Sequence, residues 1–529
     1  MDLGSDPPPP SATIVLPGRR PASPQSGTGD LTPELIETSI WSEQMLGAAG
    51  IPIVDAPFVS VGGGLGSLAV AHVLSIAGVT PDRIRILGDG EDPAAAYAHL
   101  AGNSQIPVSE RLRSDAGSVM DNIWAFPSYA LREAWEDRRL RPVAQVVTEP
   151  VLAEYFTPRA GQVFRSVARE TQRIGWRDML ELGHVRMVRR RDEGGFFVVH
   201  TPSGRSETAR VAYRTDLVHL AVGYPGVQLL PDLQVYRSRT GDRTRVVNAY
   251  EFHRHVYDEL VRRPATIVLR GSGIVASRVL QKLIDDRDAR GAQTRIVHLF
   301  RNYVDEPQGT TRTFRRPAAH GFAYQAFNFP KAAWGGQLRN RLARLDGAER
   351  SRLIDAMGGT NTAPRRAWRE QLERGRREGF YEQVVGRVID VDRSEDGQSV
   401  LTTIENDSGD LQRIEAQFVI DATGLEADIG QHRLLGDLLA HSGARRNPKG
   451  RLDVDRTFEV AGTRHGDGRM YASGAMTLGG PYAPVDSFLG LQYAALTIAD
   501  DLAKIGFAER IGPWRSLRHW WRWAKGGRP

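Results

Sequence analysis

The first pattern in this chain that points to chemistry is a glycine-rich string behind a short apolar run. The string follows Phe58–Val61 and precedes a second apolar run at residues 68–75. Glycines at this spacing let the backbone approach a pyrophosphate, and the helix that follows offers free N–H groups and the positive end of its dipole. Ser67 is small enough to replace a third glycine. We therefore predict a strand, a dinucleotide-binding turn and a helix. The turn residues are Gly62, Gly63, Gly64, Gly66 and Ser67.

A dinucleotide site of this kind needs a carboxylate at the end of the next strand, where it binds the ribose hydroxyls. The sequence predicts that strand at residues 83–87, so the carboxylate is expected at Gly88 or Asp89, with Glu91 close behind. We assign the role to Asp89. The alternative is that Asp89 is a solvent-exposed acidic residue of a turn and binds no ligand.

A second glycine string follows the strand predicted at residues 266–270 and opens another helix. Its members are Gly271, Ser272, Gly273 and Ala276. The next strand, predicted at residues 295–300, ends in Arg301 and not in an acidic residue. An arginine there favours the 2′-phosphate of NADP over the free hydroxyl of NAD. The second turn therefore predicts NADPH, unless Arg301 is only a surface residue of an arginine-rich chain.

Two further strings mark where the chain would pass between the two units. The strand 417–421 ends in Asp421-Ala-Thr423-Gly424, and residues 217–223 have the same form just before the second glycine string. Small residues at a strand end suit a chain that leaves one domain for another. These strings predict a first domain that the chain leaves, and later re-enters, around an inserted second domain.

Three shorter strings complete the set of candidate site residues. Residues 324–330 contain Asn328, residues 359–362 contain Asn361, and Asp486 opens the string 486–491.

The order of these motifs, from Ala56 to Lys504, resembles the two-dinucleotide-binding-domain flavoproteins, and most of all their class B monooxygenases of the N-hydroxylating and Baeyer–Villiger types. The resemblance implies bound FAD and NADPH, and a flavin C4a-(hydro)peroxide that acts on a small nucleophile such as an amine. It also implies that Asn328 and Asn361 contact the substrate or the nicotinamide, although either asparagine could instead serve a turn. Asp486, Thr423 and Gly424 are implied to lie close to the cofactors.

The chain departs from this family at two places. The segment Asn248–Phe252 lacks the histidine of the Baeyer–Villiger fingerprint, and Gly474 is followed by Ala475 where many members carry an aspartate. We keep Gly474 as a flavin contact. Two alternatives stay open: an NAD(P)H-dependent dehydrogenase that passes electrons to a quinone, and a non-catalytic cofactor-binding protein.

Composition narrows the chemistry further. The 529 residues include no cysteine, which excludes thiolate metal sites, iron–sulfur ligation and cysteine redox relays. No paired carboxylates or Ser/His/Asp set suggests catalytic residues, and His253 and His255 are badly spaced for a metal. The net charge of +6 comes without an array that predicts nucleic-acid binding. No apolar run approaches the ~20 residues of a membrane span, and no secretory signal is visible, so we expect a cytoplasmic protein. The substrate and the oligomeric state are not indicated.

These motifs predict an α/β protein with two nested Rossmann-like domains and small antiparallel β layers. We expect a disordered arm at 1–35, the first part of an FAD domain at 36–225, an NADPH domain with a helical insertion at 226–385, and the second part of the FAD domain at 386–505. A basic aromatic tail follows at 506–529. Its tryptophans and arginines suit a membrane surface, the body of the protein or another subunit.

Overall fold

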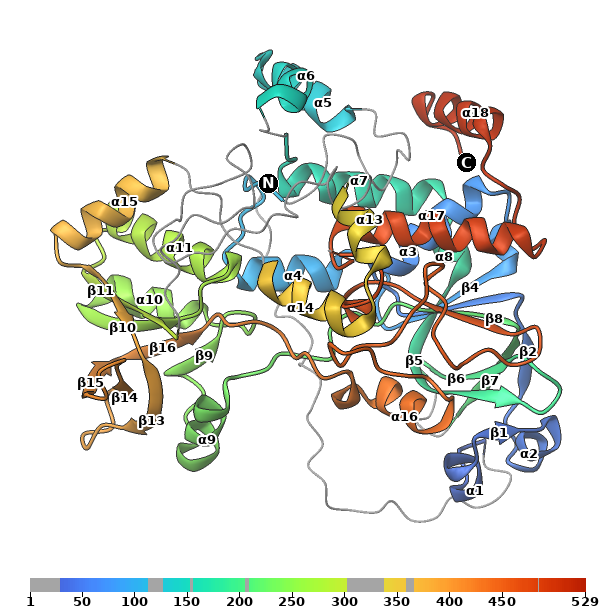
Figure 1. Ribbon diagram of the computed structural model, residues 1–529, viewed down its shortest axis with the longest axis horizontal. Helices are drawn as coiled ribbons and strands as arrows, with labels where there is room; N and C mark the ends of the chain where they lie inside the picture. The colour runs from blue at the N-terminus through green and yellow to red at the C-terminus, as the bar shows by residue number, and fades with distance from the viewer. Residues whose placement is uncertain are drawn as a thin grey trace.

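The computed structural model describes residues 29–112, 127–152, 156–204, 209–301, 337–357, 366–483 and 485–529. Two lobes stand side by side, each built around its own sheet (Figure 1). The described helices are α1 (Pro33–Glu37), α2 (Glu43–Ala48), α3 (Leu65–Ile76), α4 (Ala95–Asn103), α5 (Ser128–Glu136), α6 (Arg141–Leu152), α7 (Ala160–Arg173), α8 (Trp176–Met179), α9 (Pro231–Thr240), α10 (Arg254–Arg262), α11 (Ile274–Arg290), α13 (Gln337–Arg344), α14 (Gly347–Met357), α15 (Arg366–Arg377), α16 (Arg433–His441), α17 (Phe488–Lys504) and α18 (Pro513–Ala524).

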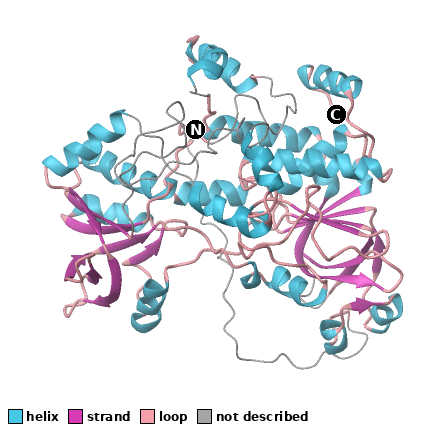
Figure 2. Ribbon diagram, in the orientation of Figure 1, coloured by secondary structure: helices cyan, strands magenta, loops and turns pink. Residues whose placement is uncertain are grey.

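The first lobe contains a sheet with the strand order β17-β8-β3-β4-β5-β6-β7-β2, and β1 pairs with β5. The strands are β1 (Ile40–Trp41), β2 (Ile53–Asp55), β3 (Phe58–Val61), β4 (Ile84–Gly88), β5 (Leu180–Arg191), β6 (Phe196–Pro202), β7 (Val211–Thr215), β8 (Leu217–Leu220) and β17 (Arg469–Ala472). Strands β17, β8, β3, β4 and the start of β5 are parallel, and β5, β6 and β7 form an antiparallel layer. Helices α3 and α17 cover one face of the parallel part (Figure 2). Burial on both faces explains why β3 is entirely buried.

The second lobe contains a parallel sheet in the order β12-β11-β10-β16-β9. Its strands are β9 (Val246–Asn248), β10 (Ala265–Arg270), β11 (Thr294–Phe300), β12 (Tyr381–Val385) and β16 (Phe418–Asp421). Apolar side chains pack on both faces of this sheet, with α10 and α11 on one face and α9 on the other. The predicted α/β class, with a parallel set of strands in each lobe, is therefore confirmed.

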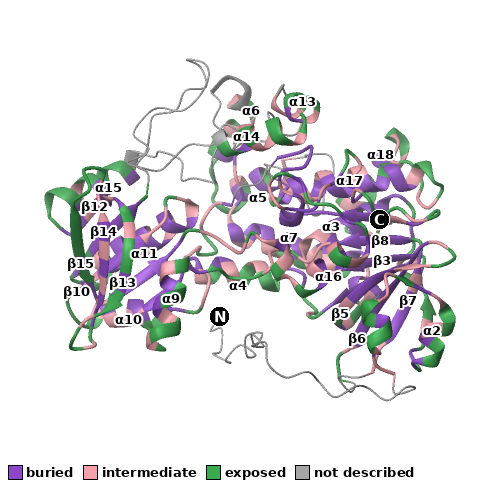
Figure 3. Ribbon diagram, turned by 60° about the horizontal axis from the view of Figure 1, so that its bottom comes forward, coloured by how far each residue is buried: buried purple, intermediate pink, exposed green. Residues whose placement is uncertain are grey.

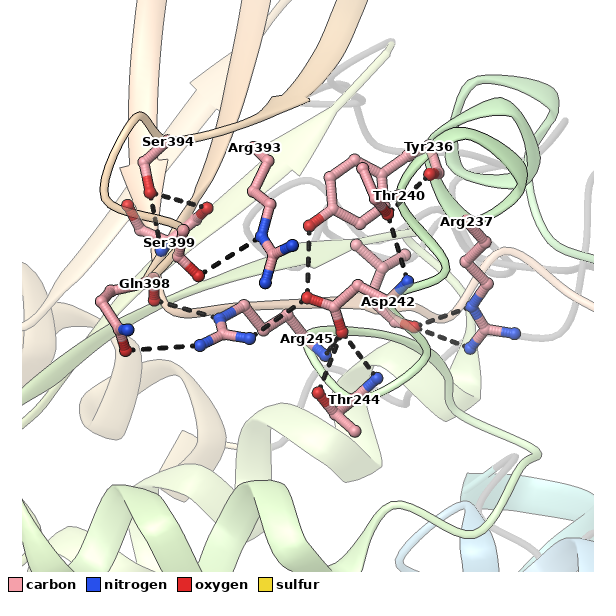
Figure 4. A network of polar contacts seen from close by, with 12 residues as sticks. Tyr236, Arg237, Thr240, Asp242, Thr244, Arg245, Arg393, Ser394, Gln398 and Ser399 are labelled. Atoms are coloured by element: carbon pink, nitrogen blue, oxygen red, sulfur yellow. Dashed lines mark hydrogen bonds and ion pairs between the residues drawn. The ribbon is translucent and has the colours of Figure 1, made fainter.

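An antiparallel sheet of β13 (Arg387–Arg393), β14 (Val400–Glu405) and β15 (Leu411–Ala416) packs on the second lobe. Figure 4 shows one of its attachments: Arg245 Nε donates to the Gln398 carbonyl (3.1 Å), while Asp242 accepts from the backbone of Thr244 (2.9 Å) and Arg245 (3.0 Å). Burial alone would raise the pKa of Asp242, but its hydrogen bonds from Arg245 and Thr244 hold this pKa at about 2.

This attachment corrects the domain boundary that we expected at residue 386. Strands β13, β14, β15 and β16 belong with the second lobe, and the chain returns to the first lobe only after Asp421. The alternating pattern of residues 387–416 identifies an antiparallel layer but carries no sign of which sheet it packs against.

The disordered arm that we expected at residues 1–35 does not include residues 29–35. From Gly29 onward the chain is described, and Leu31 and Leu35 are buried in a small cluster with Trp41. Asp30 pairs with Arg210 at 2.9 Å. Among the described residues, no helix has the length and apolarity needed to span a membrane.

Candidate functional site

The first glycine turn connects β3 to α3. Gly62 has φ +107°, and a Cβ atom on it would lie 2.4 Å from the carbonyl oxygen of Ala221, at the end of the neighbouring strand β8. Gly64 precedes the first residue of α3, where no side chain caps the helix and a Cβ would meet nothing within 4 Å. The turn therefore lies tight against β8 on one side and presents uncapped helix N–H groups on the other, which is the arrangement that binds a phosphate.

The end of β4 closes this turn from the other side. A Cβ on Gly88 would lie 2.4 Å from Gly63 Cα, so the two backbones pass each other in contact. Asp89 is the next residue, and it is exposed. Glu91, the neighbouring candidate, pairs instead with Arg177 at 3.2 Å. The structure thus puts Asp89 next to the turn, and its role stays a prediction.

A buried chain of polar groups lies beneath the first turn. The Ser67 hydroxyl donates to the Gly62 carbonyl, and Ser60 Oγ donates to Ser67 Oγ (2.8 Å). His219 then joins Ser60 through Nδ1 (2.8 Å) and Ser473 through Nε2 (2.9 Å). Because Ser60 gives its only proton to Ser67, Nδ1 must be the protonated nitrogen, and Nε2 accepts from Ser473. This chain fixes the Gly62 carbonyl away from the phosphate side of the turn.

The sequence did not indicate His219, since a lone histidine in an apolar strand carries no local signal. It is fully buried, and desolvation lowers its pKa from 6.5 to about 3. The ring is therefore neutral throughout the physiological range.

Because His219 is held neutral, the stability of the first lobe should depend on pH below about 6.5. Between pH 6.5 and about 3 the unfolded chain binds a proton that the folded chain excludes, so this contribution is complete above pH 6.5 and is lost as the pH falls. The loss is about 1.4 kcal/mol per pH unit. Between about pH 7 and pH 5, the free energy of unfolding of the unmodified protein should fall by about 2 kcal/mol more than that of His219→Gln, whose side chain does not titrate. Denaturant unfolding of both proteins at the two pH values measures this difference, and equal pH slopes would contradict it.

The second glycine turn, between β10 and α11, repeats the geometry of the first. Gly271 has φ +125°, and its Cβ would lie 2.5 Å from the carbonyl oxygen of Ala422, at the end of β16. Gly273 precedes α11 without any side-chain cap. Ser272 is exposed on the turn and Ala276 is buried beneath it. Both turns therefore place a glycine with positive φ against the carbonyl of an alanine that follows the adjacent strand.

In the second turn a histidine bonds the carbonyl of the first glycine directly. His298 of β11 donates through Nε2 to the Gly271 carbonyl (2.7 Å), and Tyr381 lies 3.1 Å from its Nδ1. Desolvation lowers the His298 pKa to about 4, so the ring is neutral and Nε2 carries the proton. Arg301 directly follows β11 and is exposed, at the end of the strand that neighbours the turn.

The segment after β16 is held by a buried carboxylate. Asp421 accepts from Thr423 N (3.0 Å), Thr423 Oγ1 (2.6 Å) and Leu230 N (2.8 Å), and burial raises its pKa. The polar groups of Thr423 are thus turned toward the protein. Gly424 has φ +140°, and a Cβ there would meet nothing within 4 Å. Asp421 therefore shapes the return path between the lobes, with Gly424 open beside it.

Two candidates from the C-terminal part of the chain, Gly474 and Asp486, lie in the first lobe. Gly474 is buried with φ +83°, and it follows Ser473, whose Oγ would lie 3.2 Å from a Cβ on Gly66. Asp486 is exposed and accepts from the Tyr224 hydroxyl at 2.9 Å. Burial and this carboxylate raise the pKa of Tyr224 well above 10. Gly474 thus adjoins the first turn, while Asp486 contacts the segment by which the chain first leaves the lobe.

The structure does not test the two remaining candidates. Asn328 and Asn361 lie outside the described residues, so their roles stay predictions. His253 bonds Tyr257 (2.9 Å) and His255 bonds the Thr244 carbonyl (2.9 Å). Over the ranges that the structure describes, no three His, Asp or Glu side chains gather as metal ligands.

Solved structures share this architecture. Ornithine hydroxylase PvdA from Pseudomonas aeruginosa aligns over 84% of this chain and 98% of its own, with 17% identity and a TM-score of 0.58. Ornithine N-hydroxylase KtzI from Kutzneria sp. 744, in a structure named for reduced FAD, NADP+ and L-ornithine, aligns over 86% and 100% (14% identity, TM-score 0.60). The cadaverine monooxygenase DfoA from Erwinia amylovora, bound to FAD, aligns over 85% and 94% (15% identity, TM-score 0.59).

At the level of sequence, no protein-family model and no curated protein matches this chain. The structural likeness confirms the predicted fold of two nested Rossmann-like domains. It also confirms, for the fold, the resemblance to N-hydroxylating flavin monooxygenases.

Proposed function

We propose that this protein is an FAD- and NADPH-dependent monooxygenase that hydroxylates a small nucleophilic substrate such as an amine. The observation that carries the proposal is the pair of glycine turns, one per lobe, each a concave backbone cradle at the carboxyl edge of a parallel sheet. One cradle would hold a single nucleotide. Two cradles of the same geometry suit a hydride donor and a hydride acceptor.

The residues present fit these two cofactors. At each turn a Cβ would fill the contact that the first glycine makes, and the helix behind it has no cap of its own. We assign FAD to the turn at Gly62, with Asp89 at its ribose and Gly474 near the flavin, and NADPH to the turn at Gly271. When bound, the two cofactors would supply hydride transfer and the activation of molecular oxygen.

The chain's own part in the reaction is to bind and orient. The uncapped N–H groups of α3 and α11 would receive the diphosphates. Neutral His298 bonds the Gly271 carbonyl directly. The Gly62 carbonyl is held by Ser67, which neutral His219 supports through Ser60. A protonated histidine is not required at either place. The similar fold of amine hydroxylases that act on ornithine and cadaverine supports an amine as the substrate class. We keep the cytoplasm as the proposed location.

Anaerobic and aerobic turnover separate this function from its alternatives. The purified protein should show flavin absorption that NADPH bleaches without oxygen, and under air with ornithine, lysine and cadaverine as probes it should form a product heavier by one oxygen atom. NADPH oxidation that continues under nitrogen with an added quinone, and no oxygenated product, would show a dehydrogenase. A protein that takes up neither FAD nor NADPH would show a non-catalytic one.

Arg301 should decide which nicotinamide nucleotide is used. Its side chain is exposed at the end of β11, where the 2′-phosphate of NADPH would pair with it. We expect Arg301→Ala to raise KM for NADPH by roughly tenfold or more, as expected for the loss of one charge-assisted contact, and to leave KM for NADH unchanged.

Arg295 provides the matched control for this experiment. It is an exposed arginine of the same strand, paired with Glu382 at 2.7 Å, but it lies at the opposite end from the glycine turn. Arg295→Ala should change neither constant. An equal rise in KM for both nucleotides in Arg301→Ala would show that Arg301 does not recognise the 2′-phosphate.

A further inference from the structure

Helix α18 (Pro513–Ala524) packs on the first lobe through a side that carries Ser516, His519 and the half-buried Trp520 and Trp523. Ser516 and His519 are buried, and the His519 ring lies 5.8 Å from that of His72 in α3. Arg515 Nη1 donates to the Ile76 carbonyl at the end of α3 (3.2 Å). The helix is thus fixed to the body through a serine, a histidine and an arginine.

The opposite side of α18 carries three further large apolar residues. Trp514, Leu517 and Trp521 are 83%, 54% and 58% exposed. Their spacing of three and four places them on one face of the helix, which we call the tryptophan face. Figure 3 shows α18 at the edge of the molecule with much of its surface exposed. A helix that leaves two tryptophans and a leucine exposed on one face presents an apolar surface that suits a partner outside the chain.

The buried side of the helix supports this conclusion. Neither ring nitrogen of His519 has a hydrogen-bond partner among the described residues, and desolvation lowers its pKa to about 3. The helix thus buries a histidine without hydrogen-bond partners among the described residues while Trp514 and Trp521 stay exposed, which packing against the body alone does not favour.

The charges around the tryptophan face identify what it meets. No acidic residue occurs from residue 510 onward. Glu509, the last one, pairs with Arg515. The basic residues of this segment are Arg510, Arg515, Arg518, Arg522, Lys525 and Arg528. Arg518, Arg522 and Lys525 are exposed, and Lys525 Nζ lies 5.1 Å above the Trp521 ring. A second copy of the chain would bring the same cations against these ones, so self-association through this face is unfavourable, whereas an anionic surface is complementary to it.

We propose that α18 docks the protein on the surface of a phospholipid bilayer that contains anionic lipids. Trp514, Leu517 and Trp521 enter the headgroup region, where indole rings are favoured. Arg518, Arg522 and Lys525 contact the lipid phosphates. The helix lies in the plane of the interface and does not span the membrane.

Docking through α18 leaves the glycine turns accessible. The helix touches α3 at His72 and Ile76, whereas the first turn lies at the other end of α3, at Gly64. The inference therefore does not depend on the proposed function, and nucleotide binding offers a separate check that a variant is folded.

Co-sedimentation of the full chain with vesicles tests the proposal. The protein should bind vesicles of phosphatidylcholine mixed with phosphatidylglycerol, bind phosphatidylcholine alone more weakly, and dissociate as salt is raised. Trp514→Ser combined with Trp521→Ser should weaken binding by roughly tenfold or more, and Arg518→Glu combined with Arg522→Glu should remove the preference for the anionic lipid. All variants should keep the circular dichroism spectrum of the unmodified protein.

Trp135 of α5 supplies the matched control, because it is also a helical tryptophan and is 86% exposed. Trp135→Ala should bind the mixed vesicles as the unmodified protein does. The proposal is wrong if the unmodified protein stays in the supernatant with both vesicles, or if Trp135→Ala loses as much binding as the α18 variants. It is also wrong if the tryptophan face instead causes dimerisation in sedimentation velocity or binds a single-stranded oligonucleotide in preference to vesicles.

Discussion

A Gly62→Ala variant is expected to purify with less than about a tenth of the flavin carried by the unmodified protein. The new Cβ would lie 2.4 Å from the Ala221 carbonyl oxygen, at a residue whose φ is +107°. Left-handed strain and the overlap together cost about 3 kcal/mol, which corresponds to an affinity for FAD roughly a hundredfold weaker if the turn moves to relieve them. Flavin absorption after heat release, divided by protein concentration, measures the content.

Gly47→Ala is the matched control for this variant. Gly47 lies within α2 of the same lobe, and a Cβ there would meet nothing within 4 Å. This variant should keep its full flavin content, and its stability should not fall, since alanine is the better helix former. A Gly62→Ala protein with a full complement of flavin would show that FAD does not bind at this turn.

The second large effect is expected for Gly271→Ala, which should stay yellow but should no longer be reduced by NADPH. Its Cβ would lie 2.5 Å from the Ala422 carbonyl oxygen, with φ at +125°. We expect the rate of anaerobic flavin bleaching by NADPH to fall by roughly a hundredfold, by the same reasoning as for the first turn. Dithionite should still bleach the flavin completely.

The two glycine variants check each other. If FAD and NADPH are assigned to the correct turns, the Gly62→Ala protein should lose flavin and the Gly271→Ala protein should lose only reduction by NADPH. The reverse pattern would exchange the two assignments. Loss of flavin in both variants would indicate general unfolding, which the circular dichroism spectrum would reveal.

Much of the fold could be predicted from the sequence because its motifs are local. A buried parallel strand, a glycine turn and a helix follow one another within about 20 residues, so β3 and α3, and later β10 and α11, are visible in the chain itself. Strand β4 was expected from residue 83, but it begins at Ile84 because Pro81–Arg83 forms a 3-10 turn.

The polar support of the first turn could not be predicted in the same way. Ser60, His219 and Ser473 are far apart in the chain, and they meet because β3, β8 and β17 are neighbours in the sheet. No periodicity encodes that order. The boundary at residue 386 failed for a similar reason, since the attachment of β14 to the second lobe depends on contacts with residues near Arg245.

Each of the alanines that support the two glycine turns also begins a segment that connects the two lobes. Ala221 begins the segment by which the chain leaves the first lobe, and Ala422 begins the segment by which it returns. Any rotation of one lobe against the other that shifts these connecting segments also shifts the floor under a bound diphosphate. We therefore expect occupancy of the two nucleotide sites to be thermodynamically linked. Linkage is reciprocal, so the factor by which one nucleotide alters the affinity of the other is the same in both directions.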